Sequence, residues 1–422
     1  MKKRKVFEFI IIIILLLLSL VLFYFIFFFD KKTEVNKTAD ILVTQNNLEQ
    51  KYTNNLKEND YSFNDPKVIL DPYGNSPLTA LIMFNTDTSQ AVSISVEGKD
   101  DKTTINYTFS SSKTHILPIY GLYANYKNKI TLKVGNKTKI VYIKTKKLPS
   151  DFILPTKVTA NKTKINNNLI FVSPSSTGYV SAYDMNGDVR WYLEGSYCWD
   201  IQRLKNGHLL IGSNRQINYP YYSVGLVEID LSGKIYNEYT LPGGYHHDVF
   251  EMENGDFLIA TNDFTSGTVE DHVALMDRKT GKIKKTWDVS KILPEDEGKS
   301  ENWESYDWFH NNAVWYDKNT NSIMLSGRHQ DAVINIDYDT GKLNWIIGDS
   351  TNWSKKMKKY FFTPTGTNFE WQWSQHAAMV LPNGNIFLFD NGNNRSKIKN
   401  KYVSANNNYS RAVIYNINTK NM

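Results

Sequence analysis

The sequence contains a single cysteine, Cys198, among its 422 residues. No disulfide can therefore form within the chain, and its stability must come from packing alone. Cys198 lies between Tyr197 and Trp199 in an expected strand. A buried and inert thiol is the better interpretation there than a nucleophile.

A surplus of charge of one sign is also missing. The 49 lysines and arginines exceed the 43 aspartates and glutamates by only six, and these charges are scattered along the chain. No basic stripe of the kind that binds nucleic acid is present, so nucleic acid is not an expected partner. Beyond about residue 62 the apolar residues alternate instead of following a helical period, which argues against a helical solenoid.

The one long hydrophobic run lies at the N-terminus. Basic residues from Lys2 to Lys5 precede an almost purely apolar stretch from Phe9 to Phe29, and no small-residue cleavage site follows it. At about 1.5 Å per residue this stretch spans a hydrocarbon core of roughly 30 Å. We predict that residues 1–32 form a single-pass anchor in the cell membrane, with a cleaved signal and secretion as the alternative. The positive-inside rule places the remaining chain outside the cytoplasm.

The rest of the sequence divides into a linker and two domains. Residues 33–61 are polar and rich in asparagine, lysine and glutamate, which is typical of a tether. Residues 62–148 contain short alternating runs separated by turn residues, and they predict a small immunoglobulin-like β-sandwich. Residues 149–422 are dominated by a repeat.

Two recurring phrases make up this repeat. The first begins with histidine at His247, His310 and His376, and with tryptophan at Trp199. The second is a strand, an aspartate, a glycine turn and a second strand that often ends in tryptophan. Two hairpins per unit make a four-stranded sheet, and units of roughly 45 to 65 residues match propeller blades. We therefore predict an all-β chain whose sandwich domain is followed by a β-propeller.

The last unit is incomplete as written. After the strand from Asn385 to Phe389, only one further strand is expected before Met422. We expect that part of the final blade is missing, in preference to an early strand that closes the ring. An open sheet edge favours aggregation, and a homodimer that shields the edge is one candidate assembly.

Equivalent positions in a propeller converge on its axis, so the three histidines are expected to face one small volume. Counting from the hairpin turns places Arg328 opposite His310, and Asp390 opposite His376. A guanidinium beside an imidazole suits the binding of an anion. A carboxylate beside an imidazole suits a catalytic histidine, because it orients the ring and stabilises its charged form.

Three functions are compatible with such a pocket. Neutral imidazoles bind zinc, as in a metal-dependent hydrolase, but Arg328 would repel the ion and no carboxylate or cysteine accompanies them at ligand spacing. An anion pocket is better supported, because arginine and protonated histidine donate to oxyanions such as sulfate or phosphate. A cell-surface propeller that binds a ligand or partner without chemistry is the remaining alternative.

The motifs around the histidines resemble those of the bacterial aryl sulfate sulfotransferases. The resemblance covers about residues 62–422, and its motifs are Tyr245 to Asp248, Asp307 to Asn312, Ser326 to Arg328, Trp373 to Ala378 and Leu388 to Gly392. It implies a six-bladed propeller that moves a sulfuryl group from a phenolic sulfate ester to a phenol acceptor. It also implies that no nucleotide sulfate donor is used. The single negative charge of a sulfate monoester calls for several fixed donors and no metal, and no cofactor is expected.

The resemblance assigns roles to individual residues. His376 corresponds to a nucleophile that becomes a transient sulfohistidine, which implies ping-pong kinetics. His247, His310 and Arg328 correspond to groups that hold the sulfuryl oxygens, and one of these histidines would protonate the departing phenoxide. Asn312 corresponds to a further polar contact in the pocket.

Two more residues are candidates for substrate binding beside Asn312, namely His246 and Asp390. Between the adjacent His246 and His247, only His247 lies eight residues before a glycine, as His376 does. We therefore predict that His246 faces away from the axis. Across its hairpin His247 is expected to meet Thr261, which offers only a hydroxyl and suits a supporting donor.

Overall fold

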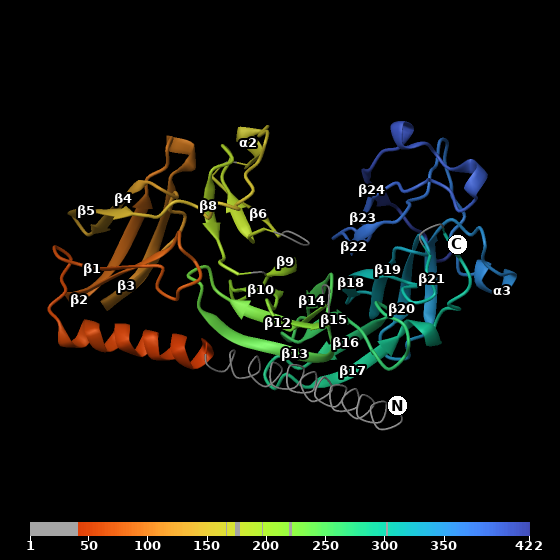
Figure 1. Ribbon diagram of the computed structural model, residues 1–422, viewed down its shortest axis with the longest axis horizontal. Coiled ribbons are helices and arrows are strands. Elements are labelled where there is room, and N and C mark those ends of the chain that lie inside the picture. The colour runs from red at the N-terminus through yellow and green to blue at the C-terminus, as the bar shows by residue number, and fades with distance from the viewer. Residues whose placement is uncertain (1–40, 166, 174–177, 196, 219–221, 301–302) are drawn as a thin grey trace, which may run out of the picture. The chain divides into compact units, whose positions relative to one another are not determined.

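The computed structural model describes residues 41–422 apart from 166, 174–177, 196, 219–221 and 301–302. The anchor predicted for residues 1–32 lies outside the described residues. Within them, no helix is both long and apolar enough to cross a membrane. The chain divides into two compact units (Figure 1). Among the described residues, the first comprises 41–122, 126–145 and 232–237, and the second contains the remainder.

The first unit is built on one antiparallel sheet. Its strands are β1 (Lys67–Leu70), β2 (Ala80–Val96), β3 (Ile105–Ile119), β4 (Lys127–Val134) and β5 (Lys137–Lys144), in the order β1-β2-β4-β5 with β3 also paired to β2. Burial alternates along β2 and β4, as expected for strands with one face in a core. The strands predicted for residues 62–148 are therefore confirmed.

Residues 41–58 are helical, whereas the sequence predicted a polar tether over 33–61. The helix is fixed on the first unit by two kinds of contact. Leu56 packs against Leu81 and Met83 in a buried cluster. The side chain of Gln45 accepts a hydrogen bond from the Ile235 N–H at 2.7 Å and donates one to the Gly233 carbonyl at 3.2 Å. The prediction missed this helix because a few apolar residues in a polar stretch suffice to anchor it.

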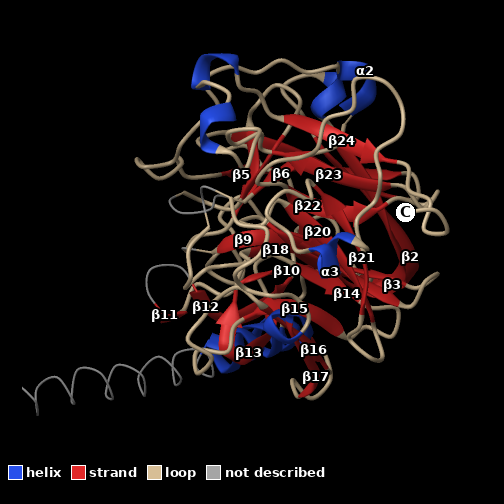
Figure 2. Ribbon diagram, turned by 90° about the vertical axis from the view of Figure 1, so that its right-hand side faces the viewer, coloured by secondary structure: helices blue, strands red, loops and turns tan. Residues whose placement is uncertain are grey.

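The second unit contains five antiparallel sheets in its described part. Strands and loops make up most of the described chain, and helices are few and short (Figure 2). Their strands, sheet by sheet, are β6 (Ile170–Val172), β7 (Ser181–Tyr183) and β8 (Val189–Tyr192); β9 (Cys198–Arg203), β10 (Leu209–Gly212), β11 (Gln216–Asn218), β12 (Tyr222–Ile229) and β13 (Ile235–Tyr245); β14 (Val249–Glu251), β15 (Phe257–Thr261), β16 (His272–Met276) and β17 (Ile283–Asp288); β18 (Asn311–Asp317), β19 (Ser322–Gly327), β20 (Ala332–Asp337) and β21 (Leu343–Gly348); and β22 (His376–Val380), β23 (Ile386–Asp390) and β24 (Arg411–Tyr415). The short helices are α2 (Lys162–Ile165) and α3 (Lys355–Lys358). The prediction of an all-β chain is confirmed.

The recurring aspartate-to-glycine phrase builds the same turn in successive sheets. In the third sheet Asp277 Oδ1 accepts from the Thr280 N–H at 2.8 Å, and the Gly281 N–H donates to the Asp277 carbonyl. In the fourth sheet Asp337 and Thr340 repeat the first of these bonds at 2.7 Å. An aspartate that bonds its own backbone stabilises a tight turn, which explains why the phrase recurs between paired strands.

Successive sheets pack face to face. Buried side chains of the second and third sheets form one cluster, those of the third and fourth a second, and those of the fourth and fifth a third. The first strands of these sheets also contact one another in series, β9 with β14, β14 with β18, and β18 with β22. The first strand of each sheet thus lies on the same side of the unit, where the histidine phrases begin.

Candidate active site

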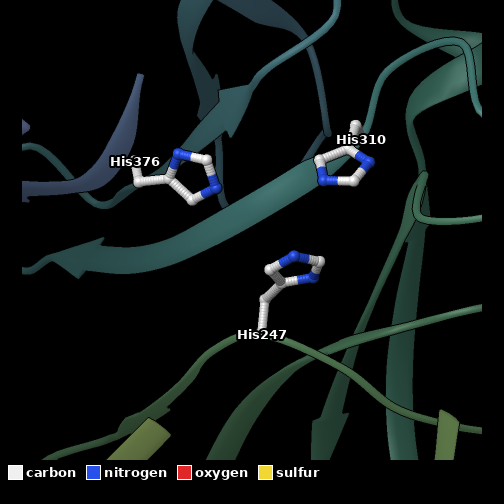
Figure 3. A group of neighbouring side chains, drawn as sticks. All are labelled: His247, His310 and His376. Carbon is white, nitrogen blue, oxygen red and sulfur yellow. The ribbon is translucent and has the colours of Figure 1, made fainter. Parts of the chain in front are cut away.

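The three repeated histidines meet at this side of the second unit (Figure 3). His247 lies two residues before β14, His310 directly precedes β18, and His376 begins β22. The ring centroids of His247 and His310 are 5.0 Å apart, and those of His247 and His376 are 6.4 Å apart. One ring nitrogen of each histidine lies within 4.8 Å of the others. The convergence that the repeat predicted is present.

A left-handed backbone recurs where each phrase begins. The φ angles are +67° at Trp199, +55° at His247 and +55° at His310, and in the fifth sheet the same conformation falls on Ala377 at +54°. Such φ values are uncommon outside glycine, and they persist only where the surrounding structure enforces them. The tryptophan of the first copy is therefore equivalent to the histidines in its backbone as well as in sequence.

A cavity of about 670 Å³ opens beside the histidines. It is lined from all five sheets of the unit: by Phe171 and Ser173, by residues 199–202, by residues 247–250, by Asn312, Val314 and Trp315, and by residues 376–379. This volume is of the size that holds a small ligand. His247 and His376 line the cavity, and Trp199 stacks on His247 at 4.6 Å between ring centroids.

His376 is neutral and has one free nitrogen. Its Nδ1 lies 2.9 Å from Asn391 Oδ1 and 3.2 Å from the Ser374 carbonyl oxygen. Both atoms accept hydrogen bonds, so Nδ1 carries the ring proton and the lone pair is on Nε2. Burial holds the pKa of His376 below its usual value, although the bond to Asn391 opposes this effect. An imidazole in this state can act as a nucleophile at neutral pH.

His310 is in the opposite state. Its Nδ1–H donates to Asp307 Oδ2 at 2.6 Å, and Glu270 Oε2 lies 3.0 Å from the same nitrogen. Burial disfavours the charged ring, but the two carboxylates outweigh it and raise the pKa of His310 to about 9. His310 is therefore an imidazolium at pH 7, with a second N–H on Nε2 available to donate.

His246 is the hydrogen-bond partner of His247. The ring of His246 is fully buried, and its Nε2–H donates to the Thr261 carbonyl at 3.1 Å. Its Nδ1 must then accept from His247 Nδ1, 3.0 Å away. Burial, together with the neighbouring histidines, holds the pKa of His247 well below its usual value despite the Glu270 carboxylate nearby. The Nε2 of His247 therefore has no proton, and no residue of the described chain hydrogen-bonds to it.

One expectation for this part of the site is wrong, and another stays a prediction. His246 is buried and does not line the cavity, and His310 and Arg328 do not line it either, so the role of His246 as a substrate contact stays a prediction. The Thr261 hydroxyl does not reach His247, because it donates to the Gly244 carbonyl at 2.6 Å. The bulged backbone at His247 ends the β14–β15 ladder at Val249 and turns the threonine side chain away.

Arg328 lies opposite His310, as the turn count predicted, and its N–H donates to the His310 carbonyl at 3.2 Å. The guanidinium Nη1 donates to His329 Nε2 at 2.7 Å. The other ring nitrogen of His329 donates to the Asp307 carbonyl, and the ring stacks on His310 at 4.5 Å. His329 thus fixes the guanidinium beside the histidine cluster, where its positive charge contributes to the low pKa of His376.

Asn312 joins the fourth sheet to the segment of the nucleophile candidate. Its Nδ2 donates to the Gln375 carbonyl at 2.8 Å, directly before His376. Its Oδ1 is buried and has no hydrogen-bond partner among the described residues. Asn312 also lines the cavity, but this oxygen itself is enclosed.

The two domains of the chain match models of one protein family. Residues 155–422 match the arylsulfotransferase model, and residues 67–149 match the arylsulfotransferase Ig-like domain. The chain belongs to the arylsulfotransferase family. Arylsulfate sulfotransferase AssT of Lelliottia amnigena is 23% identical, and AssT of Escherichia coli O6:H1 is 24% identical; both alignments cover 84% of this chain and 78% of the relative. The luciferin-regenerating enzyme is a more distant match at 10% identity and a TM-score of 0.36.

Membership of the arylsulfotransferase family confirms the enzyme class and the Ig-like domain that the motifs predicted. One predicted contact of the arylsulfotransferase site is wrong, however. Phe389, and not Asp390, lies opposite His376, because a bulge between His376 and Met379 shifts the register. A shift of one residue turns a strand side chain to the other face. Asn391 therefore takes the place expected for the aspartate.

Replacing Asp390 by alanine is expected to destabilise the arylsulfotransferase fold by about 2 kcal/mol or more, because it removes the acceptor of the buried Trp373 and Gly392 N–H groups and leaves Arg395 with only the more exposed Glu370 as an ionic partner. The carboxylate is fully buried and forms ion pairs with Arg395 at 3.2 Å and Arg411 at 2.9 Å. Urea unfolding measures the loss. Asn391→Ala is the control, since it removes a neutral contact of His376. Equal unfolding midpoints for Asp390→Ala and the wild type would refute this structural role.

Sequence reasoning missed four side chains of the arylsulfotransferase site: Glu270, Asp307, His329 and Asn391. Asp307 lies three residues before His310, within a motif already recognised, so its signal was present. Asn391 was missed because the bulge between His376 and Met379 changes which residues lie opposite each other. Glu270 comes from the connection between β15 and β16 and belongs to neither recurring phrase, so no repeat comparison could have found it.

The histidine cluster also has the spacing of a metal site. Ligand atoms within 4.8 Å of one another occur in His247, His310 and His376, and in two overlapping groups that add His246 with Glu270 and Asp307 with His329. Imidazole binds zinc only when it is neutral. The proton on His310 and the charge of Arg328 both oppose a cation at this place.

Proposed function

We propose that the protein is an aryl sulfate sulfotransferase that moves a sulfuryl group from a phenolic sulfate ester to a phenol by a ping-pong mechanism through a sulfohistidine at His376. The observation that carries this proposal is the difference between two neighbouring imidazoles. His376 has a bare Nε2, and His310 is an imidazolium beside it. A nucleophile and a proton donor are the two groups that the reaction requires.

In the first half-reaction, His376 Nε2 attacks the sulfur of the ester. The bond between sulfur and the aryl oxygen breaks, and its electron pair leaves with that oxygen. The proton on His310 Nε2 passes to this oxygen, so the first product is a neutral phenol. Arg328 faces the sulfuryl oxygens, whose negative charge is stabilised by fixed donors in a water-poor site.

In the second half-reaction, a phenol enters the cavity and returns a proton to His310. Its oxygen attacks the sulfur, and the bond to His376 breaks with the electron pair returning to Nε2. Proton exchange is nearly balanced in energy, because the pKa of His310 is about 9 and that of a phenol is about 10. Phe171, Trp199 and Trp315 supply an aromatic lining for both aryl groups.

The proposal also includes the β-propeller fold and the location outside the cytoplasm that the sequence suggested. Five sheets whose first strands line one cavity support a propeller, and the family resemblance supports six blades. The apolar run within residues 1–32 supports a membrane anchor with the catalytic unit outside the cytoplasm, or secretion after signal cleavage. A homodimer remains the proposed assembly.

An assay with a nitrophenyl sulfate donor and a phenol acceptor tests the function. Release of nitrophenol that depends on the acceptor, with formation of the sulfated acceptor, is the expected result. Donor alone should sulfate the enzyme, and peptide mass spectrometry should locate the modification on His376. Release that proceeds equally without the acceptor would indicate hydrolysis. No release by folded protein would leave a surface propeller that only binds a ligand or partner.

A metal-dependent hydrolase is the second candidate, because the three histidines have the spacing of a zinc site. The same assay separates it from transfer. A chelator should leave acceptor-dependent release unchanged if the transfer proposal is right. Loss of activity with chelator and its return with zinc would favour the hydrolase instead.

The rate of the first half-reaction should have a plateau around neutral pH. This step needs protonated His310, so its rate falls as the pH rises through about 9. It also needs neutral His376, whose pKa is lowered from about 6.5 by burial, so the rate falls again only on the acid side of that value. The rate of the phenol burst with saturating donor alone, from pH 5 to 10, measures both limits. A burst rate that keeps rising from about pH 7 to 10 would exclude His310 as the acid.

A further inference from the structure

We propose that Glu270 is a positioning residue that holds His310 and His247 in opposite protonation states and so makes His310 the group that exchanges protons with the phenols. This inference rests on the sulfuryl transfer proposed above. It concerns a residue outside both recurring phrases of the repeat. Its support is the place of one buried carboxylate between two of the three histidines.

Glu270 is fixed at both its backbone and its side chain. Its N–H donates to Asn262 Oδ1 at 2.7 Å, and its carbonyl accepts from the Asn311 N–H at 2.8 Å. Its φ of +56° is a strained value for glutamate. The Tyr222 hydroxyl donates to its Oε1 at 3.1 Å. The other carboxylate oxygen, Oε2, is thereby aimed at the histidines.

Oε2 of Glu270 faces two imidazole nitrogens. It lies 3.0 Å from His310 Nδ1 and 3.7 Å from His247 Nδ1. It accepts no hydrogen bond within the described residues, because the N–H of His310 points to Asp307 and that of His247 points to His246. Its contribution is therefore charge at close range, in a place without exposure to water.

The single negative charge of the buried Glu270 carboxylate can balance one added proton on the two imidazoles beside it. His247 and His310 have ring centroids 5.0 Å apart, so two positive charges there would repel each other strongly. Asp307 gives His310 a second negative partner, whereas the next partner of His247 is the neutral ring of His246. The extra proton therefore resides on His310. The other charged or titratable groups around His310, namely Arg328, His329 and His376, are positive or neutral and do not reverse this preference.

The titration behaviour agrees with this geometry. Burial tends to raise the pKa of Glu270, whereas the neighbouring His310 imidazolium lowers it. Glu270 thus stays ionised as long as His310 carries its added proton. A charged neighbour keeps His310 able to donate to a phenoxide and then to take a proton back.

Glu270→Gln tests the proposal, because glutamine keeps the size of the side chain and removes its charge. The reaction is measured with a series of aryl sulfates whose phenols differ in acidity. Donors with weakly acidic phenols need the proton most, so their rate should fall about 10²-fold. A nitrophenyl sulfate has a good leaving group and should lose less than about tenfold. The basic limit of the pH profile should also move to lower pH.

Glu228→Gln is the matched control. Glu228 is likewise buried and accepts from a tyrosine hydroxyl, that of Tyr239 at 2.8 Å, but its charged partner is Arg278. Its replacement should leave the dependence on the leaving group unchanged. Glu270→Asp retains the charge, so it should preserve that dependence more closely than Glu270→Gln even if its overall rate falls.

Histidine ring titration by NMR in the full chain gives a readout that does not require turnover. The signal of His310, identified by its loss in His310→Gln, should titrate at clearly lower pH in Glu270→Gln. An unchanged His310 titration, or an equal loss of rate for every donor, would overturn the proposal. If the wild type transfers no sulfuryl group, the proposed function has failed, whereas the titration still decides whether Glu270 sets the two protonation states.

Discussion

His376→Ala is expected to abolish sulfuryl transfer, with turnover lower by at least about 10⁴-fold. The variant loses the only atom that accepts the sulfuryl group from the donor, so both half-reactions stop. Direct transfer between two phenols in the cavity would require both oxygens to be held in line with sulfur at once. Nitrophenol release under saturating donor and acceptor measures the loss, and a donor-only burst should disappear with it.

His208→Ala is the control for this variant. His208 lies in the connection between β9 and β10 and pairs with Glu228 at 2.7 Å, on a network separate from the three histidines. It should keep near wild-type turnover and a normal burst. A burst that survives in His376→Ala would assign the nucleophile to another residue. His247 would then be the next candidate, because its Nε2 is also bare.

Arg328→Ala is expected to lower turnover by about 10² to 10³-fold, the usual loss when one fixed donor to a developing charge is removed. The negative charge on the sulfuryl oxygens is redistributed as the ester bond breaks, so the effect should appear mainly in kcat and less in KM. Arg328 is suited to this role because His329 holds its guanidinium at 2.7 Å. Steady-state kinetics with one good donor measures both constants.

Arg328→Lys separates charge from geometry. Lysine keeps the positive charge but not the planar fork of donors, so it should recover part of the lost rate. An Arg328→Ala enzyme with wild-type kcat and a raised KM would show that the guanidinium binds the ground state and the transition state equally. The arginine would then act in substrate capture and not in the chemical step.

The repeat made the convergence of the histidines predictable. His247, His310 and His376 begin equivalent phrases, and equivalent strands of stacked sheets share one side of the unit. Because of the same regularity, counting residues from the hairpin turn predicted that Arg328 lies opposite His310. Both features follow from local chain geometry, which sequence periodicity records directly.

The side chains that contact these histidines were harder to predict from the sequence. Asp390 was expected beside His376, but a bulge of the kind that inserts one residue into a strand moved Asn391 there. Thr261 turned away from His247 because the ladder ends at the strained histidine. Bulges depend on packing between sheets, so a count of residues along one hairpin does not reveal them.

The sequence by itself determined the all-β class, the repeat, the family resemblance and the histidines that meet, because alternation and recurring turn residues act over short stretches of chain. Only the tertiary structure decided how those histidines differ. Glu270 and Asp307 keep a proton on His310, while Asn391 and His246 leave bare nitrogens on His376 and His247. These protonation states depend on burial and on charges brought together from distant segments, and no local pattern encodes them.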